Sequence, residues 1–197
     1  MRTPFFSVLG LAILCLFQTQ AEVPVQPGFQ QDQFAGTWFS IGFASNSQWF
    51  KEKKSEMKMC TTVVTPLEDG NLDVTSTYPK LDHCETRKSI FVRTGQPGRF
   101  NYASKRTGIQ HVVTVVETNY SEYAMLLVKK ANDPDAAMVT LYGRSKELRP
   151  ELLEKFTQLA LAEELTNDDI LILPRTGKSQ REIKAVFAVD QCMEETV

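Results

Sequence analysis

The side chain of this sequence best suited to chemistry is Cys60, which stands where the stretch Met57–Val64 takes on a strand pattern. The chain has four cysteines, and Cys60, Cys84 and Cys192 remain if the N-terminal leader described below is removed. A secreted protein with an odd number of cysteines usually pairs one between molecules or keeps a reactive thiol. Cys60 therefore distinguishes an enzyme with a cysteine nucleophile from a passive carrier.

Three hydroxyl side chains are expected beside the Cys60 sulfur. Residues of one parity share a face of a strand, so Thr62 points to the same side as Cys60. A hairpin turn at Gly70 pairs this strand with the next, where Ser76 takes the same face, and Ser40 comes from an earlier strand. Hydroxyl groups that donate to sulfur stabilise the thiolate, the nucleophilic form of cysteine. The alternative is a set of ordinary strand residues around an inert, buried cysteine.

A cluster of lysines precedes Cys60, at positions 51, 53, 54 and 58. Their charge is expected either to lower the pKa of the thiol or to hold the carboxylate of an acidic ligand. Lys54 is the candidate for the second role. The alternative is a solvated loop face, because charged side chains usually lie at the surface.

Metal, triad and nucleic-acid chemistry find little support. The histidines are His83 and His111 alone, and no Cys-x-x-Cys or His-x-x-x-His spacing occurs, so neither a metal site nor a catalytic triad is predicted. The formal net charge is -2, which lacks the basic excess that binding to a phosphate backbone needs. Nucleic acid is therefore not an expected partner.

The N-terminus has the pattern of a secretory signal peptide. Arg2 precedes an apolar run from Phe5 to Phe17, and cleavage is expected after Ala21. No later stretch approaches the roughly 20 apolar residues of a membrane helix. We therefore expect residues 1–21 to be removed and the rest to be secreted through the endoplasmic reticulum as a soluble monomer.

The remaining chain is predicted to form one all-β domain with one packed helix. Short alternating segments with turns at a spacing of roughly ten residues are typical of antiparallel sandwiches and barrels, and eight strands can close a small barrel that holds one ligand. The expected strands are 34–43, 59–65, 71–78, 85–93, 99–104, 110–117, 122–129 and 137–143. Pro150 and an apolar repeat predict an outer helix to about Glu164, followed by a short strand at 169–174. The expected parts are an N-terminal segment (22–33), the barrel with its helix (34–174) and a tail (175–197).

The first strand carries a family signature. The segment Phe34–Phe39 contains Gly36 and Trp38 and resembles the glycine-x-tryptophan motif of the lipocalins. Residues Thr118–Tyr120 resemble the threonine-aspartate-tyrosine turn of that family, with asparagine replacing aspartate, and Arg144 is placed like its arginine that packs on the tryptophan. The resemblance implies an eight-stranded, up-and-down antiparallel β-barrel of the lipocalin (calycin) type, with the arginine stacked over the tryptophan ring.

Longer runs resemble the branch of the lipocalins that isomerises prostaglandin H2 to prostaglandin D2. They are 38–40, 44–47, 52–54, 59–60, 84–87, 115–118, 140–142 and 154–157. The resemblance implies that Cys60 is the catalytic nucleophile and that Ser40, Thr62 and Ser76 form its hydroxyl network.

The chemistry of the substrate gives this match a reason. Prostaglandin H2 contains an endoperoxide with a weak O–O bond, which a soft thiolate is suited to attack. Attack opens the bridge, a ring carbon loses a proton, and collapse to a ketone releases the sulfur. No metal or bound cofactor is expected, and the resemblance implies that a free thiol such as glutathione assists turnover.

Five residues are expected to contact the substrate: Trp49, Lys54, Met59, Tyr78 and Tyr142. A barrel that takes a C20 fatty acid needs an apolar lining of this kind, although such residues also simply fill a barrel. The competing hypothesis is a carrier, without enzymatic activity, of retinoids, fatty acids or bile pigments. The two hypotheses are compatible, because the resembling enzymes also carry lipophilic molecules.

Further expectations concern the periphery. The resemblance implies a disulfide between Cys84 and Cys192, although residues 175–189 are an insertion relative to the family. Asn119 begins the one acceptor sequence for an N-linked glycan. The resemblance also implies association with endoplasmic reticulum or nuclear membranes.

Overall fold

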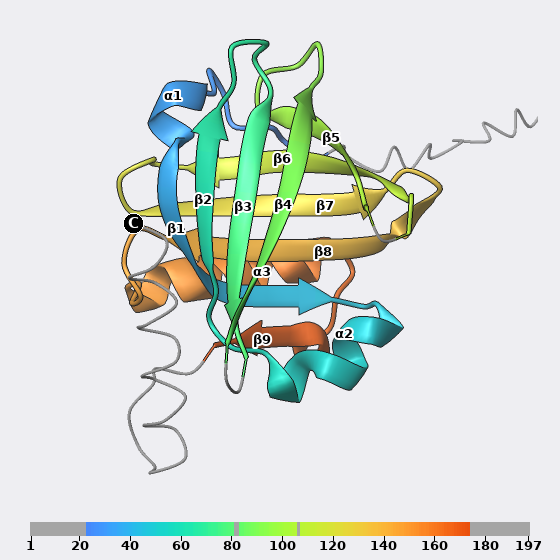
Figure 1. Cartoon of the computed structure of the whole chain (residues 1–197). Coiled ribbons are helices and arrows are strands. Elements are labelled where there is room, and N and C mark those ends of the chain that lie inside the picture. Colours follow the sequence, from blue (N-terminus) through green and yellow to red (C-terminus); the bar gives the residue numbers. More distant parts are fainter. Residues whose placement is uncertain (1–22, 81–82, 106, 174–197) are drawn as a thin grey trace, which may run out of the picture.

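The computed structural model describes residues 23–80, 83–105 and 107–173. Within these ranges, antiparallel strands close into a barrel with a helix on its outside (Figure 1). Strands β1 to β8 each pair with the next, and β1 pairs with both β8 and β2, which closes the ring. The strands are β1 (Gly36–Ser45), β2 (Thr61–Pro66), β3 (Leu72–Pro79), β4 (Cys84–Arg93), β5 (Arg99–Ala103), β6 (Gln110–Thr118), β7 (Tyr123–Lys130) and β8 (Asp133–Gly143). The predicted eight-stranded barrel is confirmed.

The start of β8 differs from the prediction. The sequence suggested a turn at 132–135 and a strand from Ala137, whereas β8 begins at Asp133. Asp133 pairs with Lys130, and the register shifts between Lys129 and Lys130. This irregularity confines the turn to residues 131 and 132, so turn-forming residue types extend the strand instead.

Helix α3 (Pro150–Ala162) packs on the outer face of the barrel, as the apolar repeat predicted. Its buried residues are Leu152, Phe156 and Ala160. Gly42 of β1 lies against it, since a Cβ there would stand 2.9 Å from Cε1 of Phe156. After α3 comes a short 3-10 helix, η2 (Asn167–Asp169), and β9 (Ile170–Ile172), which pairs with β1. No helix of the described ranges is long and apolar enough to span a membrane.

Besides η2, three short helical segments were not predicted. They are α1 (Gln31–Phe34), α2 (Gln48–Lys53) and the 3-10 helix η1 (Lys54–Glu56). Each is too short for a helical repeat to stand out in the sequence. Segments α2 and η1 connect β1 to β2, at the opposite end of the barrel from α1 (Figure 1).

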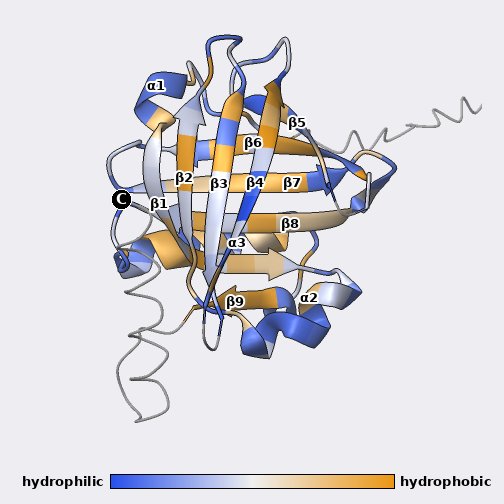
Figure 2. Cartoon of the chain, viewed as in Figure 1, coloured by the Kyte–Doolittle hydropathy of each residue, from blue (hydrophilic) through white to orange (hydrophobic). Residues whose placement is uncertain are grey.

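Two apolar clusters build the core, and Figure 2 shows hydrophobic residues alternating with hydrophilic ones along β2 to β4. One cluster fills the end of the barrel near α1 and includes Trp38, Leu72 and Phe100. The other joins the α3 interface to the region around Cys60. The α1 end of the barrel is therefore closed by packed side chains.

Arg144 ties this closed end together. Its Cζ atom lies 3.6 Å from the centroid of the Trp38 ring, and the indole Nε1 donates to the carbonyl of Phe34 at 2.9 Å. The guanidinium donates to four backbone carbonyls, those of Gln33, Ala35, Thr37 and Tyr120. Gly36 has a φ of +96°, and a Cβ there would stand 3.2 Å from Nη1 of Arg144. The glycine thus allows the arginine to approach the backbone.

We predict that Arg144→Met lowers the free energy of unfolding by about 3 kcal/mol, because four carbonyls and the indole ring lose a charged partner. Urea unfolding measures this loss. Arg149→Met is the matched control, since Arg149 is exposed and pairs with Glu122, and its loss should stay below about 1 kcal/mol. Equal losses in the two variants would contradict this role of Arg144.

Candidate active site

Cys60 lies immediately before β2 and is a free, buried cysteine with 4% of its surface exposed. Strand β1 runs beside it, and the backbone N–H of Ser40 donates to the carbonyl of Cys60 at 3.0 Å. The Oγ of Ser40 lies 2.9 Å from the Sγ of Cys60, and either group can donate in this contact. The closure of the barrel through β1 and β2 therefore brings a hydroxyl to the sulfur.

A second hydroxyl pair lies on the same face of the sheet. Thr62 and Ser76 oppose each other in the β2–β3 register, with their oxygens 2.9 Å apart. The Thr62 hydroxyl also lowers the pKa of the Cys60 thiol. Ser76 thus forms a hydrogen bond with Thr62, while Ser40 and Thr62 favour the thiolate form of Cys60.

Burial dominates the acidity of the thiol. Removal from water raises the pKa of Cys60 to about 11, although hydrogen bonds from Ser40 and Thr62 oppose the rise. Burial disfavours the thiolate because an anion loses its hydration, and the hydroxyls return part of that stabilisation. The resting form of Cys60 at neutral pH is therefore the thiol.

Two tyrosines approach the same face. Extension of the β2–β3 register by one pair sets Tyr78 opposite Cys60, and Tyr142 opposes Ser40 in the β1–β8 register. Burial raises the pKa of Tyr78 to about 12, and the charge of a Cys60 thiolate adds to the rise. Burial also raises the pKa of Tyr142. Both phenols therefore stay neutral and keep an O–H to donate.

The remaining apolar candidates differ in their positions. Met59 is 9% exposed and belongs to the same apolar cluster as Cys60, against which Tyr78 also packs. Trp49 lies on α2 and is 49% exposed. The structure thus gathers Met59, Tyr78 and Tyr142 near the cysteine and leaves much of Trp49 at the surface.

Three of the four lysines before Cys60, namely Lys51, Lys53 and Lys54, have other partners. They contact the loop segments around them: Lys51 with Asp169 at 3.4 Å, Lys53 with Glu56 at 3.3 Å and Lys54 with the carbonyl of Asp168 at 2.7 Å. The expectation that their charge lowers the pKa of Cys60 is wrong, since burial raises that pKa and no lysine contributes to it. Lys54 is also held against η2 rather than presented to the sulfur.

A different cation, Arg87, occupies the inner face of the barrel. It opposes Ser76 in the β3–β4 register, and its Cζ lies 5.3 Å from the centroid of the Tyr78 ring. Sequence reasoning missed Arg87 because side chains were assigned to the inner face only for the strands that became β2 and β3, and not for β4. The same parity argument, carried to β4, finds it.

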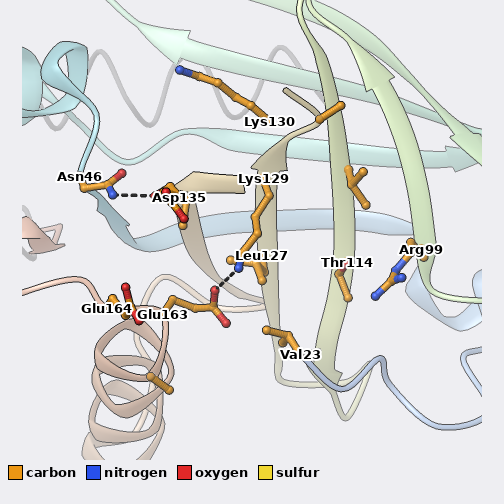
Figure 3. Close-up of a pocket in the computed structure, with 14 residues that line it drawn as sticks. Val23, Asn46, Arg99, Thr114, Leu127, Lys129, Lys130, Asp135, Glu163 and Glu164 are labelled. Atoms are coloured by element: carbon orange, nitrogen blue, oxygen red, sulfur yellow. Dashed lines mark hydrogen bonds and ion pairs between the residues drawn. The ribbon is translucent and has the colours of Figure 1, made fainter. Parts of the chain in front are cut away.

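No group of three histidine, cysteine or acidic side chains within the described ranges is arranged to hold a metal ion. A pocket of about 650 Å³ lies on the outer wall, where the end of α3 meets β6 and β7 (Figure 3). Thr114 and Leu127 line it, together with the ion pair of Lys129 and Glu163 at 2.7 Å. The alternate residues of these strands, such as Val113, face the core, so this pocket is separate from Cys60.

Several of the predictions concern the periphery of the domain: the disulfide, the signal peptide and the glycan. Cys192 and the signal peptide (1–21) lie outside the described residues, so the pairing with Cys84 stays a prediction. The Asn119 side-chain oxygen accepts from the backbone N–H groups of Glu122 and Tyr123 at 2.9 and 3.1 Å. Asparagine therefore caps this turn as aspartate would, and the glycan at Asn119 stays a prediction.

Known proteins resemble this chain over nearly its whole length. It is 49% identical to a protein of Rhinella marina named lipocalin, over 90% of this chain and 96% of that protein. It is 44% and 45% identical to the prostaglandin-H2 D-isomerases of Equus caballus and Mus musculus, covering 92% and 88% of this chain and 97% and 96% of those proteins. A sequence model of the lipocalin / cytosolic fatty-acid binding protein family matches residues 35–177. With its closed barrel, its Trp38–Arg144 closure and these matches, the chain belongs to the lipocalin family.

Proposed function

We propose that this protein isomerises prostaglandin H2 to prostaglandin D2, with Cys60 as the nucleophile. The observation that carries the proposal is the buried Cys60 sulfur with the Ser40 hydroxyl 2.9 Å away, while the Thr62 hydroxyl also lowers the pKa of this thiol. The similarity to prostaglandin-H2 D-isomerases over nine-tenths of the chain supports it. We also propose that the protein is secreted after removal of residues 1–21.

The proposed cycle conserves every atom of the substrate. The Cys60 thiolate attacks one endoperoxide oxygen, forming an S–O bond while the O–O bond breaks. The other oxygen leaves as an alkoxide and takes a proton. The carbon that bears the sulfur-bound oxygen then releases its proton to water, which balances the proton taken up by the alkoxide. The electron pair of that C–H bond forms the ketone, and the S–O bond breaks to return the thiolate. No reductant is consumed, so a free thiol such as glutathione would serve to keep Cys60 reduced.

The high pKa of Cys60 has two opposing effects on this step. A thiol with a pKa of about 11 is rarely ionised at neutral pH, which lowers the concentration of the nucleophile. A thiolate of high basicity is also intrinsically more nucleophilic, which offsets part of the loss. Hydroxyl donation from Ser40 and Thr62 stabilises the anion without exposing it to water.

The carrier hypothesis has its own support in the same site. A buried thiol whose resting form is protonated is also compatible with a small hydrophobic wall residue. In that case the barrel binds small lipophilic molecules such as retinoids and Cys60 takes no part. The cysteine side chain distinguishes the two functions.

We predict that Cys60→Ala reduces formation of prostaglandin D2 to the spontaneous background while the affinity for retinoic acid changes by no more than a few-fold. Only one small side chain is lost, so the barrel lining changes little. Product analysis and fluorescence titration measure the two effects. Ser89→Ala, a comparable truncation at the position opposite Val74, should retain full product formation. Turnover by Cys60→Ala at the rate of the parent protein would overturn the assignment.

We predict that activity rises with pH toward the pKa of Cys60 and that Ser40→Ala moves the profile to higher pH. Loss of a hydrogen bond to the thiolate disfavours the anion, which corresponds to an upward shift of roughly one pKa unit. Alkylation rates of Cys60 as a function of pH measure this shift, with Ser89→Ala as control. Superimposable alkylation curves for Ser40→Ala and the parent protein would rule out the proposed contact as a determinant of acidity.

A further inference from the structure

The inner face of β4 continues the row of side chains that contains Cys60. Tyr78 of β3 stands opposite Glu85 of β4, and Ser76 stands opposite Arg87. Because Ser76 bonds to Thr62 on the inner face, its partner Arg87 takes the same face. Arg87 therefore stands on the inner face of β4, with 56% of its side chain exposed to solvent.

The position of the guanidinium is held by two neighbours. Its Cζ lies over the Tyr78 ring at 5.3 Å from the centroid, a cation–π arrangement. Its Nε and Nη2 atoms donate to one oxygen of Glu85 at 2.9 and 2.8 Å. A guanidinium has five N–H donors in a planar fork, so this contact with one oxygen leaves donors for a second acceptor.

The spacing between the strand that follows Cys60 and the strand that carries Arg87 matches the size of an acidic ligand. Neighbouring strands are about 4.8 Å apart, so β2 and β4 are separated by roughly 10 Å across the sheet. This is comparable to the extended carboxyl-bearing chain of prostaglandin H2, which joins the carboxylate to the ring that carries the endoperoxide. A ligand whose ring lies at Cys60 can therefore extend its carboxylate across Tyr78 to β4.

We propose that Arg87 binds the carboxylate of the ligand and thereby orients its reactive ring toward Cys60. The choice of prostaglandin H2 as the ligand rests on the proposed function. The binding of a carboxylate by Arg87 does not depend on it. Arginine is suited to the role because its planar fork of N–H groups can donate two parallel hydrogen bonds to a carboxylate. Glu85 holds the guanidinium in place and competes with the ligand for it. Arg87 is then a specificity residue that distinguishes acids from the corresponding alcohols.

The test compares two probes that differ at one end, retinoic acid and retinol. Arg87→Gln should weaken retinoic acid binding about tenfold, the effect of losing a hydrogen bond to a charged group, and should leave retinol binding unchanged. Glu85→Gln should tighten retinoic acid binding, since it removes the competing carboxylate. Lys88→Gln is the matched control, because Lys88 is the next residue on the outer face, where it pairs with Asp73, and its loss changes the net charge equally.

The outcomes separate this proposal from the proposed function. Equal effects of Arg87→Gln on the acid and the alcohol, no effect on either, or an equal loss in Lys88→Gln would overturn it, whether or not the protein has isomerase activity. In the isomerase assay, Arg87→Gln should raise KM for prostaglandin H2 about tenfold and leave KM for its methyl ester unchanged. Absence of isomerase activity in the parent protein, with the retinoid discrimination intact, would refute the proposed function alone.

Discussion

The pairing of β1 with β2 is the constraint on which the rest of the site depends. Strand β1 pairs with β8 along most of its length and with β2 at its beginning, and this double pairing closes the barrel. Closure removes two sheet edges and sets Ser40 beside Cys60, residues that are 20 positions apart in sequence. The Trp38–Arg144 contact holds the same strand at its first residues. The packing that stabilises the fold therefore also places a hydroxyl next to the sulfur.

The site shows a conflict between burial and reactivity. In the proposed function, an enclosed barrel would shield a lipophilic ligand and the Cys60 sulfur from water, but the same enclosure raises the pKa of Cys60 to about 11. Hydroxyls resolve part of this conflict because they stabilise an anion without carrying a charge of their own. A lysine in their place would need burial of its own charge, and the lysines of the α2 and η1 segments instead pair with acidic groups or a carbonyl at the surface.

Much of the fold and part of the site follow from the sequence alone. Alternation located all eight strands, and parity set Cys60, Thr62 and Ser76 on one face, because a strand repeats every two residues whatever its surroundings. The parts that were missed depend on contacts distant in sequence. The start of β8 follows from a register shift against β7, and the position of Lys54 follows from its bond to Asp168, 114 residues away. Arg87 is a different case, since parity extended over one more strand identifies it.

The measurement that tests the central claim most directly uses a small, reversible cap on the sulfur. The protein lacking residues 1–21 is treated with methyl methanethiosulfonate, which adds only an S–CH₃ group to Cys60, and its products from prostaglandin H2 are analysed before capping, after capping and after reduction. The account predicts prostaglandin D2 above the spontaneous background, loss of this excess with the cap, and its return on reduction. No excess from protein that still binds retinoic acid, or an undiminished excess with Cys60 fully capped, would contradict it.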